Sequence, residues 1–295
     1  MAIRTTIEAL QSLGVGANTL TPEQRHGLDQ NGFVIFQPSR GYWSDKGIDL
    51  EAVRSLVDEL IEAEGWRGGF EGKEDVITPE RTLDPGSNRL GNLLNKNSVF
   101  RKLALLPELV AAAHHVLRDE IKIGACDVRE PKANNGWQSI HIDWFPRISE
   151  SDSFDNVAAA IYLDPADRNN GVVRIIPGSH KILDWPDEHW DCSEGHPDEV
   201  QPALNAGDII VFNTNVWHGG AMNTDGRRRR TIYIDYRNRK WPQLLNQKTY
   251  LSENTKLALT DVEQYLLGVR ADDPLQKEAS YTSGGAFKEK YGHAM

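Results

Sequence analysis

The feature that most constrains the fold is a run of short strand candidates that follow one another with no helix between them. Each candidate is an apolar or alternating stretch bounded by Gly, Pro, Asn or Asp, the usual signature of a strand that ends in a turn. The candidates are Ile121–Arg129, Trp137–Asp143, Val157–Leu163, Val172–Ile176, Gly207–Phe212 and Arg229–Tyr236. Parallel strands need crossover connections, so this order predicts an antiparallel sandwich or barrel.

The residues on either side of this run carry mainly helical signals. Thr21 and Pro22 predict a capped helix that ends near Gly32, and the Gly- and Pro-rich stretch 67–97 predicts loops with one short strand near Arg89. The other elements expected are a buried strand over 33–36, a helix over 50–61 and two helices within 98–118, the second starting at Pro107. We therefore expect a mainly β protein with flanking helices.

One domain over residues 1–295 is the simplest organisation that these elements allow. Helices and a strand over 1–120 would support the core, residues 121–240 would form the β core that carries the functional site, and residues 241–295 would form a helical C-terminal extension. The sequence contains no internal repeat and no low-complexity tract.

The composition narrows the classes of partner. A net charge of −10 argues against general nucleic-acid binding, which depends on neutralising phosphates, and favours a small-molecule substrate. No apolar run reaches the length needed to span a bilayer, and the N-terminus lacks the pattern of a secretory signal, so we expect no membrane contact and a cytoplasmic location. The two cysteines fit neither a disulfide framework nor a zinc site. The expected state is a monomer or a homodimer.

Two residues in the second strand candidate could hold a metal ion. A single residue separates His141 from Asp143, so on a strand their side chains point to the same face. Ile140 and Ile142 then pack behind them. Such a pair is common by chance, so the prediction depends on a third ligand. His218 is the best candidate, because a buried strand leads to it and the two glycines after it permit close approach to the backbone. Two histidines and one carboxylate are typical of non-haem Fe(II) oxygenases.

Four consecutive arginines enter the last strand candidate. By itself the run Arg227–Arg230 is typical of a solvated turn or a weak anionic patch. Side chains alternate along a strand, so if Arg229 points inward, Thr231 does too, and the two place a guanidinium fork and a hydroxyl on the metal's side of the barrel. That pair suits a carboxylate.

The motifs, taken in order, resemble those of the phytanoyl-CoA dioxygenase (PhyH) family of Fe(II)- and 2-oxoglutarate-dependent oxygenases. They are His141-Ile142-Asp143, the stretch from Arg168 to His180, Gly207-Asp208, the stretch from Trp217 to Gly220, Asn223 and Arg229. The resemblance runs from about His141 to Tyr236, and the Asn-Gly-Phe-Val stretch near residue 32 also resembles the family's first strand. Nothing beyond Trp241 matches.

The resemblance implies a double-stranded β-helix, a jelly roll of the cupin type, which agrees with the strand order above. It also implies Fe(II), 2-oxoglutarate and O2 as the reacting cofactors. His141, Asp143 and His218 resemble the iron ligands, and Arg229 resembles the arginine that holds the distal carboxylate of 2-oxoglutarate. Geometry alone adds Thr231 and Ser139 as further candidates for cosubstrate contacts.

The resemblance implies oxidation, above all hydroxylation, of an unactivated C–H bond in a small molecule, with release of succinate and CO2, in natural-product tailoring or catabolism. Related halogenases lack the carboxylate ligand, so Asp143 favours hydroxylation, desaturation or cyclisation over halogenation. The alternatives are a cupin-type isomerase or hydrolase that does not use 2-oxoglutarate and a non-catalytic binding protein. Substrate contacts are expected among Trp144, Arg147, Arg174 and Trp217, although aromatic residues in a sandwich usually belong to the core.

Overall fold

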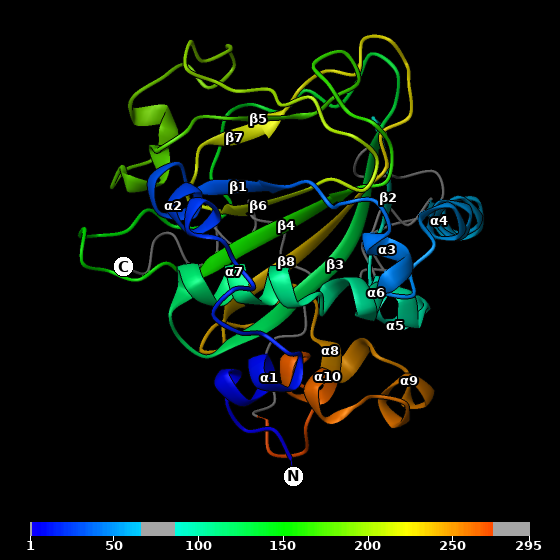
Figure 1. Cartoon of the computed structure of the whole chain (residues 1–295). Helices are drawn as coiled ribbons and strands as arrows, with labels where there is room; N and C mark the ends of the chain where they lie inside the picture. Colours follow the sequence, from blue (N-terminus) through cyan, green and yellow to red (C-terminus); the bar gives the residue numbers. More distant parts are fainter. Residues whose placement is uncertain (1, 66–85, 274–295) are drawn as a thin grey trace.

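Two antiparallel sheets form the centre of the molecule in the computed structural model, which describes residues 2–65 and 86–273 (Figure 1). The larger sheet has the strand order β1-β6-β4-β8-β3-β2, and the smaller one pairs β5 with β7. The strands are β1 Phe33–Phe36, β2 Ser87–Leu90, β3 Ile121–Pro131, β4 Asn156–Tyr162, β5 Val173–Ile175, β6 Ile209–Asn213, β7 His218–Gly220 and β8 Thr231–Asn238. The arrangement is the predicted mainly β jelly roll.

One predicted strand is wrong. Residues 137–143 form no ladder, because their backbone N–H groups donate to three separate segments: Ile140 to the carbonyl of Cys192, His141 to that of His218, and Asp143 to that of Thr214. The single bridge between His141 and His218 is all that remains of strand pairing there. The strand β7 was not predicted, because two of its residues are glycines, which are rare in strands.

The helices begin and end largely where their capping residues predict. They are α1 Thr6–Ser12, α2 Pro22–Gln30, α3 Tyr42–Asp45, α4 Leu50–Glu64, α5 Leu93–Lys96, α6 Ser98–Ala104, α7 Pro107–Leu117, α8 Gln247–Tyr250, α9 Glu253–Leu257 and α10 Asp261–Leu266. Thr21 forms a full capping box with Gln24, and Pro107 starts its own helix as expected. Of the loop expected over 67–97, residues 67–85 lie outside the described part, and the rest includes β2 and α5.

The two faces of the larger sheet have different partners. On β4, Val157, Ala159 and Ile161 point to the face covered by α7 and join the main hydrophobic core. Ala158 and Ala160 point to the opposite face, toward β5 and β7, where a second apolar cluster lies. The face of the larger sheet toward β5 and β7 is the one that borders the cavity described below, which is lined by Ala158, Val173 and His218 among others.

Three of the four consecutive arginines are bound to acidic residues rather than forming a free basic patch. Arg227 pairs with Asp167 and Asp225 on the surface. Arg228 and Arg230 both reach Asp58 on α4. Their further partners are Glu130 for Arg228 and Asp164 for Arg230. The pairs of Arg228 and Arg230 with Asp58 attach α4 to the barrel.

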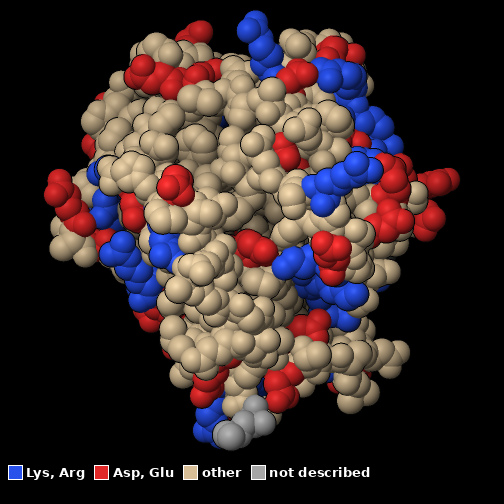
Figure 2. Space-filling view, in the orientation of Figure 1, with Lys and Arg blue, Asp and Glu red and all other residues tan. Residues whose placement is uncertain are grey.

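Acidic and basic side chains are interspersed over the face seen in Figure 2, with no broad area of one sign. Among the helices described, none is both long and apolar enough to cross a membrane. The larger sheet draws β1 and β2 from residues 1–120, so the N-terminal part supplies strands as well as helices.

Candidate metal centre and cosubstrate pocket

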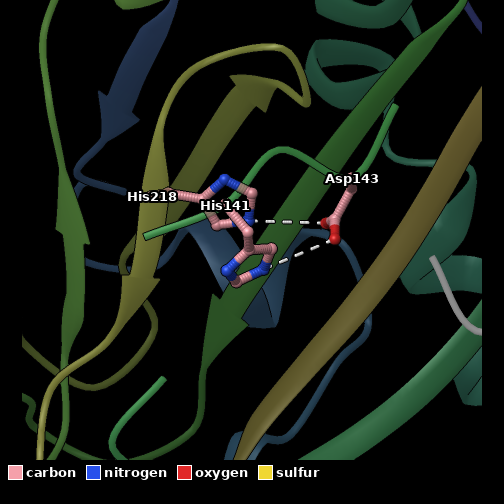
Figure 3. Close-up of side chains that lie close together, drawn as sticks. All are labelled: His141, Asp143 and His218. Carbon is pink, nitrogen blue, oxygen red and sulfur yellow. Dashed lines mark ion pairs between the residues drawn. The ribbon is translucent and has the colours of Figure 1, made fainter. Parts of the chain in front are cut away.

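Three side chains from two segments, residues 137–143 and β7, converge in the space between the sheets (Figure 3). Nε2 of His141 lies 3.6 Å from one carboxylate oxygen of Asp143, and Nε2 of His218 lies 3.4 Å from the other. One ligand atom from each residue falls within 4.8 Å of the others. Two imidazoles and a carboxylate at this separation can bind one divalent cation from one side.

Backbone carbonyls fix the orientation of both imidazoles. Nδ1 of His141 lies 2.8 Å from the carbonyl oxygen of Ser139, and Nδ1 of His218 lies 2.9 Å from that of Val216. A carbonyl only accepts hydrogen bonds, so each Nδ1 carries the proton and each Nε2 presents its lone pair toward Asp143. Metal-binding histidines are typically held in this way by a second hydrogen bond. Ser139 thus supports the site through its carbonyl, not through its hydroxyl.

The charge states of the cluster suit a divalent metal. Burial lowers the pKa of His141 to about 4, and the neighbouring His218 adds to that shift. Burial opposes ionisation of Asp143, but the neighbouring His218 and His141 and the guanidinium of Arg129 outweigh it and hold the pKa of Asp143 below its usual range. At neutral pH His141 is therefore neutral and Asp143 is ionised, the forms that coordinate metals.

The two glycines after His218 allow the chain itself to approach closely. A Cβ on Gly219 would lie 2.7 Å from the carbonyl oxygen of Gln138, and a Cβ on Gly220 would lie 2.6 Å from that of Gly136. The backbone N–H of Gly220 also donates to Oε1 of Gln138 at 3.1 Å. The segment that carries His141 therefore packs directly against β7, beside His218.

A second set of polar groups lies beside the metal cluster on β8. Arg229 is 5% exposed and donates from Nη1 to the hydroxyl oxygens of Thr231 at 2.9 Å and Tyr233 at 3.4 Å. Its Nε has no partner among the described residues. A buried guanidinium with an unused donor needs an anionic ligand, so this arrangement fits the distal carboxylate of 2-oxoglutarate.

These groups line one cavity of about 360 Å³, except Thr231, which is fully buried behind Arg229. The three metal-ligand candidates and Arg229 form part of its wall, together with polar residues from β2, β3 and β8. Polar residues that the sequence prediction did not single out here are Arg89, Asp127, Arg129, Gln138, Asn156 and Asp235. Alternation could have found Asp127 and Arg129, because β3 was predicted and the two residues share a face with Ala125.

The four residues predicted to contact substrate do not line this cavity. Trp144 packs against Phe145 and Trp241, and Trp217 joins the buried cluster of Ile140 and Ile176. Both tryptophans follow the usual core pattern for aromatic residues.

The two arginines of that prediction are also engaged elsewhere. Arg174 is fully buried, and its anionic partner is Glu199 at 2.9 Å rather than a substrate. The guanidinium of Arg174 also stacks on the ring of Trp137, 3.7 Å from its centroid. Arg147 lies outside the iron pocket and donates to the carbonyl oxygens of Glu150 and Asp152. The sequence could not reveal these partners, because each is set by the path of a loop.

Comparison with known proteins places these features in a family. The sequence model for phytanoyl-CoA dioxygenase (PhyH) matches residues 67–231, which is more than half of the chain. The chain belongs to the phytanoyl-CoA dioxygenase family. The predicted family is therefore confirmed.

Individual relatives of this family member are distant. An uncharacterized protein of Mycobacterium tuberculosis is 30% identical over 124 residues, which cover 42% of this chain and 44% of that protein. The chain thus spans less than half the length of that relative. The ectoine dioxygenase of Halomonas elongata is 24% identical over 250 residues, covering 75% of this chain and 70% of the enzyme.

The fold of this family member is also found in solved structures. The structure of HygX from Streptomyces hygroscopicus with nickel and 2-oxoglutarate bound superposes with a TM-score of 0.59 at 19% identity. The match covers 76% of this chain and 89% of HygX. At this identity the likeness confirms the jelly-roll fold alone.

Proposed function

We propose that this protein is an Fe(II)- and 2-oxoglutarate-dependent dioxygenase that hydroxylates a C–H bond of a small molecule. The observation that carries the proposal is the placement of a two-histidine, one-carboxylate cluster and a buried arginine with an unused Nε donor in one cavity. Bound iron with 2-oxoglutarate and O2 supplies the oxidising power, with release of succinate and CO2. The residues of the protein bind and position these reactants.

The roles of the residues follow from their contacts. His141, Asp143 and His218 would hold the iron, with both Nε2 lone pairs oriented by backbone carbonyls. Arg229 would bind the distal carboxylate of 2-oxoglutarate, while the hydroxyl of Thr231 holds the guanidinium in place. The cavity would position the substrate next to the iron.

The size and lining of the cavity favour a small polar substrate. Its volume of about 360 Å³ has to accommodate 2-oxoglutarate as well as the substrate. Asp127 and Arg129 on β3 and Arg89 on β2 add charges of both signs to the wall. A molecule with its own polar or charged groups fits this wall better than a fatty chain does.

Asp143 favours hydroxylation over halogenation. The carboxylate occupies the third ligand position, so a halide has no place there. Desaturation or cyclisation at the same site stays an alternative to hydroxylation, and product analysis separates them, because hydroxylation adds one oxygen to the substrate. The buried Arg229 with its unused Nε argues against a cupin isomerase or hydrolase that does not use 2-oxoglutarate.

The test is turnover with Fe(II), 2-oxoglutarate and O2 over a panel of small amino acids, cyclic amines and aminoglycosides. We expect one class to raise succinate release and to gain an oxygen atom by mass spectrometry. His218→Ala should abolish both signals. Succinate release that is unchanged in that variant would refute the proposed site.

A further inference from the structure

A second cavity, of about 550 Å³, lies away from the iron pocket. It is bounded by the end of α2, the end of α7, the segment 147–154 and the 3-10 turn Ser179–Lys181. Figure 1 shows α7 lying across the larger sheet and α2 beside β1. The lining of this second cavity shares no residue with that of the iron pocket.

Two polar side chains of this cavity keep hydrogen-bond donors without a partner. Asn213 is 1% exposed, and its Nδ2 is buried with no acceptor among the described residues. The Oδ1 of Asn213 accepts from the backbone N–H of Asn215 at 3.0 Å, which fixes the amide so that Nδ2 is the free end. The Nε of Arg147 is likewise buried and unpartnered. Buried donors without acceptors are costly, and native proteins rarely retain them without a ligand or water.

Arg147 forms no ion pair with a carboxylate among the described residues, although the charges of Asp152 and Glu150 lie nearby. Its Nη1 donates to the carbonyl oxygens of Glu150, at 2.7 Å, and Asp152, and its guanidinium lies 4.3 Å from the ring centroid of Phe154. The carboxylate of Asp152 is occupied elsewhere, because it accepts from two backbone N–H groups and from the hydroxyl of Ser149. An anion could therefore complete the surroundings of Arg147.

The rest of the wall carries charges of both signs. Its other cations are engaged, Lys181 with Gln30 and Arg118 with Asp29. Its acidic residues are Asp29, Glu150 and Asp152. Burial lowers the pKa of His180 to about 4, so this part of the wall is uncharged at neutral pH. Nδ1 of His180 packs against Gly32, where an added Cβ would lie only 2.6 Å away, so His180 forms a wall rather than a ligand contact.

The strand β6 separates this cavity from the iron pocket. Phe212 points toward the iron pocket and packs on His218, with ring centroids 4.9 Å apart, whereas the next residue, Asn213, points to the opposite face. The following carbonyl, that of Thr214, accepts the backbone N–H of Asp143 at 3.0 Å. A ligand at Asn213 would thus border the turn that positions Asp143.

We propose that this second cavity binds a small oxyanion, a carboxylate or a phosphate group, between Nε of Arg147 and Nδ2 of Asn213. The site does not depend on iron or 2-oxoglutarate, and its ligand is distinct from the cosubstrate bound at Arg229. A bound oxyanion restrains the turn that holds Asp143, which makes the cavity an effector site.

The test measures thermal stabilisation of the metal-free full-length protein by malonate or by inorganic phosphate, in a buffer without other oxyanions. We expect one probe to raise the Tm in a saturable way, and the stronger probe identifies the carboxylate or the phosphate as the ligand chemistry. Arg147→Met and Asn213→Asp should each weaken the apparent affinity at least tenfold, because each removes a donor to the anion. Asn213→Asp keeps the acceptor for Asn215 and so serves as the fold-preserving variant.

Arg229→Met is the matched control, because it removes the anion-binding group of the iron pocket and should leave this stabilisation intact. Loss of stabilisation in Arg229→Met alone would place the probe in the iron pocket and overturn the proposal. Equal stabilisation of all variants would mean an adventitious ion only, and no stabilisation by either probe would mean that water completes the site. None of these outcomes depends on turnover, so failure here is distinguishable from failure of the proposed oxygenase function.

Discussion

At the scale of single residues, four adjacent arginines have different roles because strand alternation turns them to different faces. Arg228 and Arg230 pair with acidic residues outside the barrel, while Arg229 points into the cavity. The sequence allowed this assignment for Arg229 and Thr231, since both lie at the start of β8 with the period of a strand. The partners of the other arginines come from α4, from β3 and from loops, and they could not be predicted.

Replacing Arg229 tests the proposed cosubstrate clamp. We expect Arg229→Met to raise the KM for 2-oxoglutarate by about 10- to 100-fold, because a charge-assisted hydrogen bond contributes about 1.5–3 kcal/mol. The measurement is the rate of succinate release against 2-oxoglutarate concentration. Arg228→Met is the matched control and should leave this KM unchanged, since its guanidinium faces Asp58 and Glu130. Equal effects of both substitutions would contradict the assignment.

Arg174 illustrates a prediction that the structure corrects. Its cation is satisfied by Glu199 inside the protein, so we expect Arg174→Met to act on stability and to leave an unpaired carboxylate. Loss of one partner of a buried ion pair costs about 3–5 kcal/mol, which chemical unfolding measures directly. The KM for substrate should not change in whatever protein remains folded. A selective rise in that KM would restore Arg174 as a substrate contact.

At the scale of elements, the segment 137–143 shows where periodicity fails. The alternation of Ile140, His141, Ile142 and Asp143 resembles a strand, yet the backbone bonds go to three distant segments. The two metal-ligand candidates still converge, because His141 is bridged to His218 and Asp143 is anchored on Thr214. Such long-range backbone contacts depend on the folded loops and leave no local pattern in the sequence.

The close seating of this segment on β7 leads to a prediction for Gly219. We expect Gly219→Ala to push residues 136–140 away and to weaken Fe(II) binding about tenfold, because the added methyl group would lie 2.7 Å from the carbonyl oxygen of Gln138. Gly16→Ala is the control, since a Cβ there meets nothing within 4 Å. Metal affinity can be followed by titration with Mn(II) or Fe(II) under argon. An unchanged affinity in Gly219→Ala would argue against the role of this contact.

At the scale of the whole molecule, the strand order and the absence of crossover helices were sufficient to predict an antiparallel sandwich or barrel, and the family resemblance narrowed this to the jelly roll. The helices were predictable where caps and prolines mark their ends, as at Thr21 and Pro107. The shape of the two cavities was not, because it depends on residues that are far apart in the sequence, such as Arg147 and Asn213. The division into a support, a core and a C-terminal extension stays a prediction.

Acid stability should depend on His180, whose ring is 2% exposed between α2 and the larger sheet. Burial lowers its pKa from the ordinary 6.5 to about 4, so between these values the unfolded chain binds a proton that the native protein does not. The free energy of unfolding therefore falls as the pH is lowered through this window, by about 3 kcal/mol in full. Urea unfolding of the metal-free protein should show a shallower decline in His180→Gln. Parallel declines in both proteins would contradict this origin.

The central claim is that one cavity holds iron at His141, Asp143 and His218 and 2-oxoglutarate at Arg229. The most direct test is anaerobic addition of equimolar Fe(II) followed by 2-oxoglutarate, monitored by visible absorption. The account predicts a weak charge-transfer band that is absent in His218→Ala and that requires more 2-oxoglutarate in Arg229→Met. Iron-loaded protein that shows no band at saturating 2-oxoglutarate would contradict it.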